Sequence, residues 1–298
     1  MQIEGTVCPM PTPTAGCDPK IDRESLRSYT RFLVDSGVDG LFPCGSIGEF
    51  SSLTPEQRRI VFEEVVEAAD GSPVLAGCGD TSVESVLGHV ENAANAGADA
   101  AVVVTPYYLN TTQPGLERFL RTVADRADLP IVLYNIPALT GKCLSRELVT
   151  ELATRDDVIG IKDTSGDLNY LYNVVRETPD DFFILQGATE LAVASLKIGA
   201  NGMVAGPANV FPGRVSAVFD QHQRGKVDRA QSIMNKVVNP VVSATADPPT
   251  AAAIKYLLSL AGHDVGRPLP PLPELTPPER TELESYYERI TTLANVQH

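Results

Sequence analysis

A lysine closes a short apolar run near the middle of the 298-residue chain, Val158-Ile159-Gly160-Ile161-Lys162. If this run is a buried strand, Lys162 lies where the strand reaches solvent. An amine that is partly desolvated at that point loses its proton more readily and can attack a carbonyl carbon to form an imine. The alternative interpretation is that Lys162 only marks the polar end of the strand.

Hydroxyl groups follow three other apolar runs. Tyr134 ends the run before the lysine run, and its phenol can move protons while an imine forms and breaks. Ser46 lies in the loop Gly45–Glu49, where two glycines leave backbone N–H groups free to hold a small anion. The segment Thr105–Tyr108 adds two further phenols. Taken singly, Tyr134 is also typical of a core tyrosine, and the glycine loop is also typical of a tight turn.

The elements that must position these groups are eight nearly continuous apolar runs, separated by stretches with helical spacing. Strands that are buried on both faces have this composition, and their alternation with helices favours a (β/α)8 barrel over an open doubly wound sheet. The carboxyl ends of the strands in such a barrel share one face, so we expect the reactive groups to meet there. The expected strands are Gly5–Met10, Gly40–Pro43, Val74–Cys78, Ala100–Thr105, Ile131–Tyr134, Val158–Lys162, Phe182–Gln186 and Gly202–Ala205.

Helix boundaries are marked in two ways. Thr54, Pro55 and Gln57 form the pattern of a capping box that begins a helix. Three similar joints then link a helix end to the next strand, each with a glycine as the expected left-handed stop. These joints are Ser36–Gly40, Ala96–Ala100 and Ile198–Gly202.

The last quarter of the chain has a different pattern. From about Gln221 it is helical only, through Arg224–Thr245, Pro249–Ala261 and Pro277–Ala294, with a proline-rich connector at Arg267–Pro273. We therefore expect an α/β barrel over residues 1–220. Residues 221–298 are expected to form a helical extension packed on the barrel and not an independent domain.

Composition limits the partners. The chain has 24 basic and 38 acidic residues, a net charge of -14, and a surface this acidic repels phosphate backbones and anionic lipid. We therefore expect no nucleic-acid partner and no membrane partner. Such a lysine-poor, acidic composition is typical of a high-salt cytoplasm, and an ordinary acidic enzyme fits it equally well.

No apolar run is long enough to span a membrane and the start lacks signal-peptide features, so a cytoplasmic location is expected.

Cysteine and histidine spacing argues against a metal centre. The five cysteines show no Cys-x-x-Cys pair, and three of them fall in apolar runs, which favours reduced, buried thiols. The four histidines stand far apart without ligand spacing. We therefore expect no metal.

Together these motifs resemble the pyruvate-dependent class I aldolases related to dihydrodipicolinate synthase and N-acetylneuraminate lyase. The resemblance covers nearly the whole chain and is closest to the 2-keto-3-deoxy sugar acid aldolases, which Lys162–Asp167 favours. The segments that carry it are Gly45–Glu49, Thr105–Tyr108, Tyr134–Gly141, Gly160–Asp163, Gly202–Val204 and the Leu272-Pro273 tail.

The resemblance implies a role for each matching residue. Lys162 matches the lysine that forms a Schiff base with the keto carbon of pyruvate or a 2-keto acid. Tyr134 matches the phenol that moves protons, and Ser46 matches the hydroxyl that links it to a second phenol. Tyr108 matches that second phenol, which in this family comes from an adjacent subunit. The amides of Ser46 and Ile47 match the cradle for the pyruvate carboxylate.

The same resemblance implies the surroundings of the imine. Gly187 and Val204 match main-chain positions that line the imine pocket. Family members need no cofactor beyond the lysine imine. They are usually homotetramers built as a dimer of dimers, and the role of Tyr108 requires at least a dimer.

Two positions depart from the family pattern. Many members have a second hydroxyl residue where this chain has Ile47, so one side-chain contact to the carboxylate is lost. Dihydrodipicolinate synthases carry an arginine at the position of Leu139 to hold the carboxylate of aspartate semialdehyde. A leucine cannot form that bidentate pair. This difference disfavours lysine biosynthesis.

The expected enzyme is thus a lyase. It reversibly cleaves a 2-keto-3-deoxy sugar acid, of the 2-keto-3-deoxygluconate type or its 6-phosphate, to pyruvate and an aldehyde such as glyceraldehyde. The first alternative is 4-hydroxy-tetrahydrodipicolinate (dihydrodipicolinate) synthase. N-acetylneuraminate lyase, hydroxy-oxoglutarate aldolase and keto-deoxy-sugar dehydratase rank below it. The alternative from another class is a non-catalytic pyruvate-binding barrel.

Overall fold

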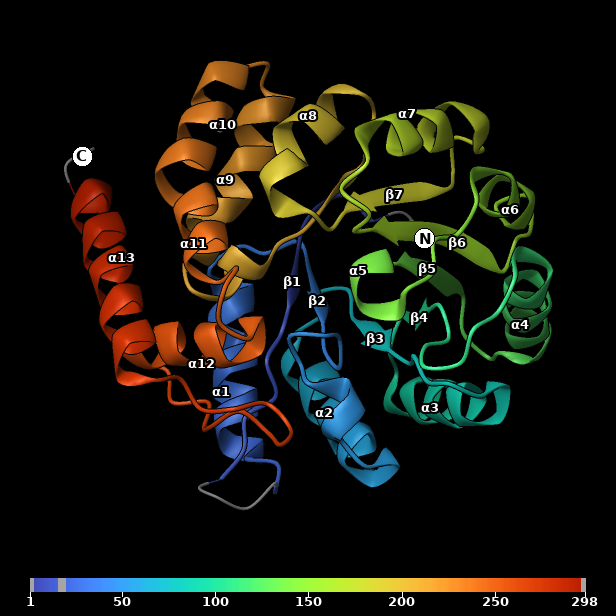
Figure 1. Ribbon diagram of the computed structural model, residues 1–298, viewed down its shortest axis with the longest axis horizontal. Coiled ribbons are helices and arrows are strands. Elements are labelled where there is room, and N and C mark those ends of the chain that lie inside the picture. The colour runs from blue at the N-terminus through green and yellow to red at the C-terminus, as the bar shows by residue number, and fades with distance from the viewer. Residues whose placement is uncertain (1–2, 16–19, 296–298) are drawn as a thin grey trace.

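Eight parallel strands form a barrel in the computed structural model, which describes residues 3–15 and 20–295 (Figure 1). The strand order is β2-β1-β8-β7-β6-β5-β4-β3. A parallel bridge between Leu41 and Val74 joins the two ends of this order. The (β/α)8 prediction is therefore confirmed, and each predicted strand agrees with the observed one to within one residue at either end. The strands are β1 Gly5–Pro9, β2 Gly40–Phe42, β3 Leu75–Gly77, β4 Ala100–Val104, β5 Ile131–Asn135, β6 Val158–Asp163, β7 Phe183–Gln186 and β8 Gly202–Val204.

Helices surround the strands, as Figure 1 shows. They are α1 Arg23–Asp35, α2 Pro55–Ala68, α3 Val83–Ala96, α4 Gln113–Arg126, α5 Pro137–Thr140, α6 Arg146–Leu152, α7 Leu168–Glu177, α8 Ala192–Lys197 and α9 Pro212–Gln223. Single turns of 3-10 helix lie at η1 Phe50–Ser52, η2 Thr189–Leu191 and η3 Gly206–Asn209. The predicted capping box is present at α2, where Thr54 Oγ1 accepts from the Gln57 amide and Gln57 Oε1 accepts from the Thr54 amide.

The three repeated joints end their helices as predicted. Gly37, Gly97 and Gly199 have φ values of 82°, 88° and 108°, which glycine adopts without steric cost. Two residues after each glycine, a side-chain oxygen accepts a hydrogen bond from the amide at or just before the start of a neighbouring strand. These bonds are Thr6 N to Asp39 at 2.7 Å, Val74 N to Asp99 at 2.8 Å and Ile184 N to Asn201 at 2.8 Å. The joint therefore stops a helix and also satisfies a strand amide that would otherwise be unpaired.

Two apolar layers fill the molecule. One packs the outer faces of the strands against the helices. The other fills the barrel interior, and its members include Val7, Phe42, Val102, Val132, Tyr134, Phe183 and Val204. The reactive side chains at the strand ends therefore pack against the close-packed barrel interior, which restricts their rotamers.

The C-terminal segment consists of α10 Val227–Ile233, a π-helical turn η4 Met234–Val238, α11 Asn239–Ala244, α12 Thr250–Leu260 and α13 Pro277–Asn295. The helical stretch predicted over Arg224–Thr245 is present as one uninterrupted helical run over residues 227–244, with a π turn inside it. Pro240 lacks the N–H that would continue the ladder, and the wider π turn before it accommodates the loss. The proposed division after residue 220 falls inside α9. Figure 1 shows α13 at the outer edge of the molecule, beyond α11 and α12.

The cysteines divide into two groups. Cys8, Cys44 and Cys78 are free and buried, as predicted, and burial raises the pKa of the Cys44 thiol to about 12. Cys143 is free but exposed, so the expectation of burial was wrong for that residue. It lies in the loop between α5 and α6, where its backbone carbonyl accepts from Gln113. Cys17 lies outside the described residues.

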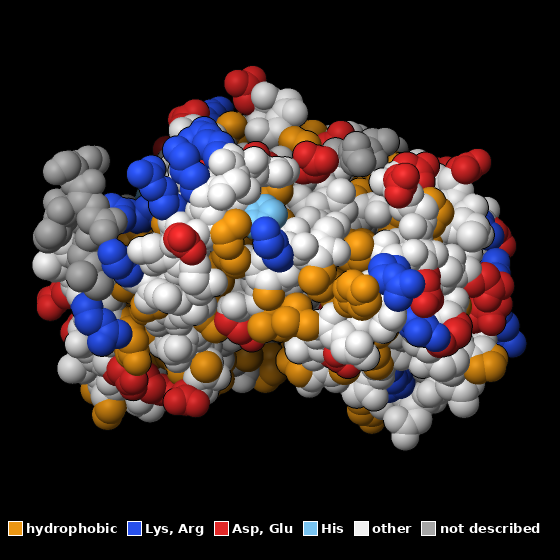
Figure 2. Space-filling model, turned by 90° about the horizontal axis from the view of Figure 1, so that it is seen from above, with side chains coloured by type: hydrophobic (Ala, Val, Ile, Leu, Met, Phe, Trp, Pro, Cys, Tyr) orange, Lys and Arg blue, Asp and Glu red, His pale blue; other side chains and the backbone are white. Residues whose placement is uncertain are grey.

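The charged surface is a mixture of both signs. Figure 2 shows acidic and basic side chains interspersed on one face of the molecule. Ion pairs link neighbouring helices around the barrel, for example Arg126 on α4 with Glu84 on α3 at 2.6 Å. Within residues 3–15 and 20–295, no helix has the length and hydropathy needed to cross a membrane.

Candidate active site

Lys162 and Tyr134 lie side by side at the carboxyl ends of β6 and β5. The two residues are partners in the parallel register, so their side chains point to the same face of the sheet, the barrel interior. Lys162 Nζ lies 3.9 Å from the centre of the Tyr134 ring and 4.8 Å from the centre of the Phe42 ring. Lys162 is only 7% exposed. The amine is thus held between two ring faces at the top of the barrel core.

Ser46 completes the group from the loop after β2. Its Oγ lies 3.5 Å from the Tyr134 hydroxyl, and either oxygen can donate. Cys44 and Glu49, one residue before and one after the Gly45–Gly48 segment, both have a φ of 55°. The Thr12 hydroxyl donates to the Gly48 carbonyl at 2.7 Å. The loop is therefore held in a fixed, strained shape beside the lysine and the phenol.

Gly187 and Thr164 border the amine on its other side. A Cβ at Gly187 would lie 3.1 Å from Lys162 Cε and 2.0 Å from Thr164 Oγ1, so a side chain there would fill this space. The Thr164 hydroxyl is buried and has no hydrogen-bond partner among the described residues. Sequence reasoning missed Thr164. The signal was its position two residues after Lys162, which places both side chains on one face of an extended strand.

Ile47 and Val204 belong to two segments that approach each other, the loop after β2 and the end of β8. Val204 is buried in the interior layer at the end of β8. Gly206 follows it, and a Cβ at Gly206 would lie 3.2 Å from Ile47 Cδ1. On this side of the site Ile47 therefore presents an apolar side chain. The backbone amide of Ile47 is its only hydrogen-bond donor.

The buried carboxylate of Asp163 forms hydrogen bonds at the end of β6, directly after Lys162. Asp163 is 1% exposed and accepts hydrogen bonds from Asn135 Nδ2 at 2.7 Å and from Ser165 Oγ at 2.8 Å. Burial raises the pKa of this carboxyl, and the two side-chain hydrogen bonds oppose that shift. Asn135 Oδ1 also accepts from the Leu144 amide at 3.0 Å. This network ties the ends of β5 and β6 to the loop after α5. The polarity of the strand ends is the one feature of the sequence that points to this network.

The remaining two predicted residues, Tyr108 and Leu139, have exposed side chains in the single chain. Tyr108 is 91% exposed and has a φ of 75°, a strained conformation for a non-glycine residue. Its neighbour Tyr107 packs edge-to-face on Phe50, and the Arg58 guanidinium lies 5.1 Å from the centre of the same Phe50 ring. Leu139, on the single turn α5, is 65% exposed.

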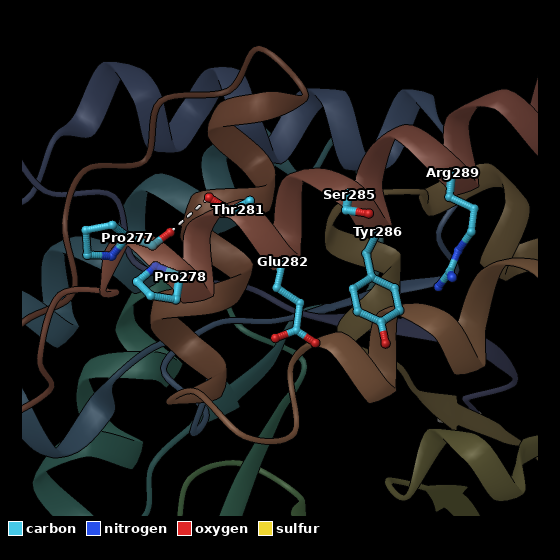
Figure 3. Close-up of a pocket in the computed structure, with 7 residues that line it drawn as sticks. All are labelled: Pro277, Pro278, Thr281, Glu282, Ser285, Tyr286 and Arg289. Carbon is cyan, nitrogen blue, oxygen red and sulfur yellow. Dashed lines mark hydrogen bonds between the residues drawn. The ribbon is translucent and has the colours of Figure 1, made fainter.

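A surface groove lies away from these residues. It has a volume of about 710 Å³ and runs along the outer face of α13. Figure 3 shows its lining, which includes Pro277, Tyr286 and Arg289 and none of the residues at the strand ends. In the part of the chain that the structure describes, no group of three or more His, Cys, Asp or Glu side chains could hold a metal ion.

A lysine at the end of β6, with a phenol against its amine and a hydroxyl at the phenol, has the groups that a Schiff-base aldolase needs. This site on a (β/α)8 barrel defines the class of protein as a pyruvate-dependent lyase. The dihydrodipicolinate synthetase family model matches residues 2–290, and the chain belongs to that family.

Individual relatives agree with this assignment. The chain is 36% identical to a 4-hydroxy-tetrahydrodipicolinate synthase of Methanoculleus marisnigri over 86% of its length and 88% of the relative. It is also 36% identical to an uncharacterized DapA-like lyase of Halobacterium salinarum, over 95% and 92% of the two chains. Among solved structures, YagE of Escherichia coli K12 in complex with pyruvate, a member of the dihydrodipicolinic acid synthase family, has a TM-score of 0.90 and 30% identity. That match covers 97% of this chain and 98% of YagE.

Proposed function

We propose that the protein cleaves a 2-keto-3-deoxy sugar acid, of the 2-keto-3-deoxygluconate type or its 6-phosphate, to pyruvate and an aldehyde such as glyceraldehyde. The observation that carries this proposal is Leu139, an apolar side chain at the position where dihydrodipicolinate synthases hold a carboxylate with an arginine. The unpartnered Thr164 hydroxyl beside Lys162 also supports it, because it can bind a hydroxyl of the substrate.

In the proposed mechanism the Lys162 amine attacks the keto carbon to give a carbinolamine. The Tyr134 phenol gives its proton to the departing hydroxyl, so loss of water leaves a protonated imine and the Tyr134 phenolate. The Tyr134 phenolate then takes the proton of the C4 hydroxyl. The C3–C4 bond breaks, the aldehyde leaves, and the electron pair of that bond moves into the imine to give an enamine. Protonation of the enamine at C3 and addition of the water restore Lys162 and release pyruvate. Ser46 and Tyr108 relay the protons that Tyr134 gains and gives up.

The loop after β2 provides the second part of the proposal. The backbone amides of Ser46 and Ile47 hold the substrate carboxylate, because main-chain N–H groups in a glycine-rich turn form an anion site. Gly187 and Val204 line the imine pocket, and the absence of a side chain at Gly187 leaves space beside Lys162. The catalytic groups are therefore Lys162, Tyr134, Ser46 and Tyr108.

The active assembly is proposed to be a homotetramer, a dimer of dimers. Tyr108 is 91% exposed and its neighbour Leu109 is 73% exposed, so both can reach a second subunit. A phenol that stands on the outer surface of one chain can serve the relay only if it enters the site of another chain.

A second candidate is 4-hydroxy-tetrahydrodipicolinate synthase, the name that the Methanoculleus relative bears. Lys142, three residues after Leu139, is a cation on the same loop, and its Nζ donates to the Thr140 carbonyl at 3.2 Å. If Lys142 turns toward the aldehyde, it can hold a carboxylate in place of the missing arginine. This reaction uses the same imine and differs only in the aldehyde.

The imine is tested by reduction. Borohydride added with pyruvate should inactivate the enzyme and leave a pyruvate-derived adduct on Lys162, identified by mass spectrometry of a digest. An adduct on Lys197 or Lys255, or no adduct, would overturn the mechanism. The Lys162→Met variant is the control and should take up no adduct.

The aldehyde is tested by condensation with pyruvate at fixed concentration. Wild-type enzyme should use glyceraldehyde and should use aspartate semialdehyde poorly. Leu139→Arg should shift the kcat/KM ratio toward the semialdehyde by about 10–150-fold, because a bidentate carboxylate pair contributes roughly 1.5–3 kcal/mol. Efficient turnover of the semialdehyde without turnover of glyceraldehyde would promote the second candidate, and Lys142→Met should then abolish that activity.

A further inference from the structure

A buried ion pair joins the loop after β2 to the C-terminal helices. Glu49 Oε1 lies 2.6 Å from Lys255 Nζ, and each side chain is 1% exposed. The other carboxylate oxygen of Glu49 accepts from the Leu269 amide at 2.5 Å. Lys255 Nζ also donates to the Arg267 carbonyl at 2.8 Å. Two charged side chains from distant segments of the chain are thus removed from water together.

Glu49 is joined to the proposed carboxylate cradle by short backbone contacts. Its amide donates to the Ser46 carbonyl at 3.1 Å, and the Phe50 amide donates to the Gly45 carbonyl at 3.4 Å. The space under the loop is tight, since a Cβ at Gly48 would lie 2.9 Å from the Met10 carbonyl oxygen. A displacement of Glu49 therefore moves the Ser46 and Ile47 amides with it.

The backbone at Glu49 is strained as well. Its φ of 55° and ψ of 35° lie in the left-handed region, which glycine adopts far more readily than glutamate. Such conformations persist where the surrounding structure over-determines them. The carboxylate anchor on Lys255 and Leu269 supplies that constraint here.

We propose that Glu49 and Lys255 are positioning residues that hold the Ser46 and Ile47 amides in the geometry that binds the pyruvate carboxylate. The inference rests on the proposed pyruvate-imine function of this site. A buried ion pair adds little stability compared with apolar side chains of similar size, so stability alone does not account for it. The connector between α12 and α13 is then part of the active-site support, through Arg267 and Leu269.

Three variants distinguish the effect of the carboxylate anchor from the effect of the strained backbone and from the effect of misfolding. Glu49→Gln removes the charge and keeps the size of the side chain. Glu49→Gly accommodates the left-handed conformation and removes the carboxylate. The double variant Glu49→Gln with Lys255→Met leaves no unpaired buried charge, so its melting temperature should lie close to that of wild type. Glu64→Gln is the matched control, because Glu64 is a buried carboxylate paired with Arg23 at 2.6 Å between α1 and α2, away from the loop.

The readout is the pyruvate concentration that gives half-maximal inactivation by borohydride, together with kcat at saturating pyruvate. We expect this concentration to rise about tenfold or more in all three variants, because misplaced binding groups weaken the interaction they were aligned for. The value of kcat should change less than the half-saturating concentration. Glu64→Gln should leave that concentration unchanged even if its melting temperature falls.

Each outcome bears on one of the two proposals. A folded double variant with wild-type half-saturation would overturn the positioning role, as would an equal rise in Glu64→Gln. Wild-type behaviour of Glu49→Gly would show that only the backbone conformation matters and would also overturn it. Failure of the wild-type enzyme to be trapped at all would instead overturn the proposed function.

Discussion

At the scale of single residues, Tyr134 connects the groups of the site. Its ring face lies against the Lys162 amine and its hydroxyl lies toward Ser46, so one side chain touches both the nucleophile and the relay. Its register pairing with Lys162 follows from the alignment of β5 and β6. The sheet therefore places the backbones of the phenol and the amine next to each other.

Tyr134→Phe removes one hydroxyl and leaves the packed ring, so the melting temperature should stay close to that of wild type. Turnover should fall by about 10²–10⁴-fold, the usual contribution of a positioned acid–base group. Ser46→Ala should have a smaller effect, because a water molecule can bridge the two phenols. Steady-state kinetics at saturating pyruvate measure both effects. Near-native turnover of Tyr134→Phe would remove the phenol from the mechanism.

The residues of the site differ in how far sequence could predict them. Lys162, Tyr134 and Ser46 follow apolar runs directly, so a barrel with aligned strand ends places them together. Thr164 and Asp163 could not be identified in this way. Their roles depend on what lies opposite them, Gly187 in one case and Asn135 in the other, and these contacts form only when the strands pair.

At the scale of elements, the barrel closes between β2 and β3. In the described backbone these two strands are linked by the Leu41–Val74 bridge, by a 2.8 Å bond from the Leu41 amide to the Pro73 carbonyl and by a 3.0 Å bond from the Gly77 amide to the Pro43 carbonyl. Gly77 approaches the chain after β2 closely, since a Cβ there would lie 2.0 Å from the Cys44 carbonyl oxygen. This contact adjoins the loop that carries Ser46.

Gly77→Ala should therefore be strongly destabilising, because backbone and not a flexible side chain occupies the space. Overpacking of this kind costs about 1–3 kcal/mol or more, and for a chain of this size each kcal/mol lowers the melting temperature by roughly 2–4 °C. Gly88→Ala on α3 is the matched control. A Cβ at Gly88 meets nothing within 4 Å, so this change should stabilise the helix. Thermal unfolding of the two variants provides the comparison, and an unchanged melting temperature for Gly77→Ala would contradict the argument.

Most of the barrel could be predicted from sequence because strands buried on both faces leave continuous apolar runs. The joints at Gly37, Gly97 and Gly199 could be predicted as helix stops. The hydrogen bonds made by Asp39, Asp99 and Asn201 could not, because they depend on which strand lies next to each joint. The π turn before Pro240 was missed for a different reason. Its apolar spacing still fits a helix, and only the ladder of hydrogen bonds changes.

At the scale of the whole molecule, the exposed side chains of Tyr108 and Leu109 stand out from a surface on which arginines and carboxylates pair. The left-handed backbone at Tyr108 costs free energy, and a side chain that is 91% exposed can offset little of that cost within one chain. An isologous interface would bury both residues and would deliver each phenol to the site of the other subunit.

Mixing two inactive variants tests this exchange. Tyr108→Phe keeps Lys162, and Lys162→Met keeps Tyr108, so each homodimer lacks one group at both of its sites. A mixed dimer has one site with Lys162 from one chain and Tyr108 from the other. With equal amounts and random pairing, half of the dimers are mixed and half of their sites are complete, so activity should recover to about a quarter of the wild-type value.

The control for this experiment is Tyr172→Phe, which alters a tyrosine on α7 that is 44% exposed and should leave activity unchanged. Co-expression with two affinity tags isolates the mixed species, whose activity per chain should be about half of the wild-type value because one of its two sites is complete, and this activity is compared with that of each parent. Recovery requires that the relay crosses between subunits, because neither chain alone carries both groups. If the mixed species shows no more activity than the mean of its parents, Tyr108 acts within its own chain or not at all, and the dimer is then not needed for catalysis.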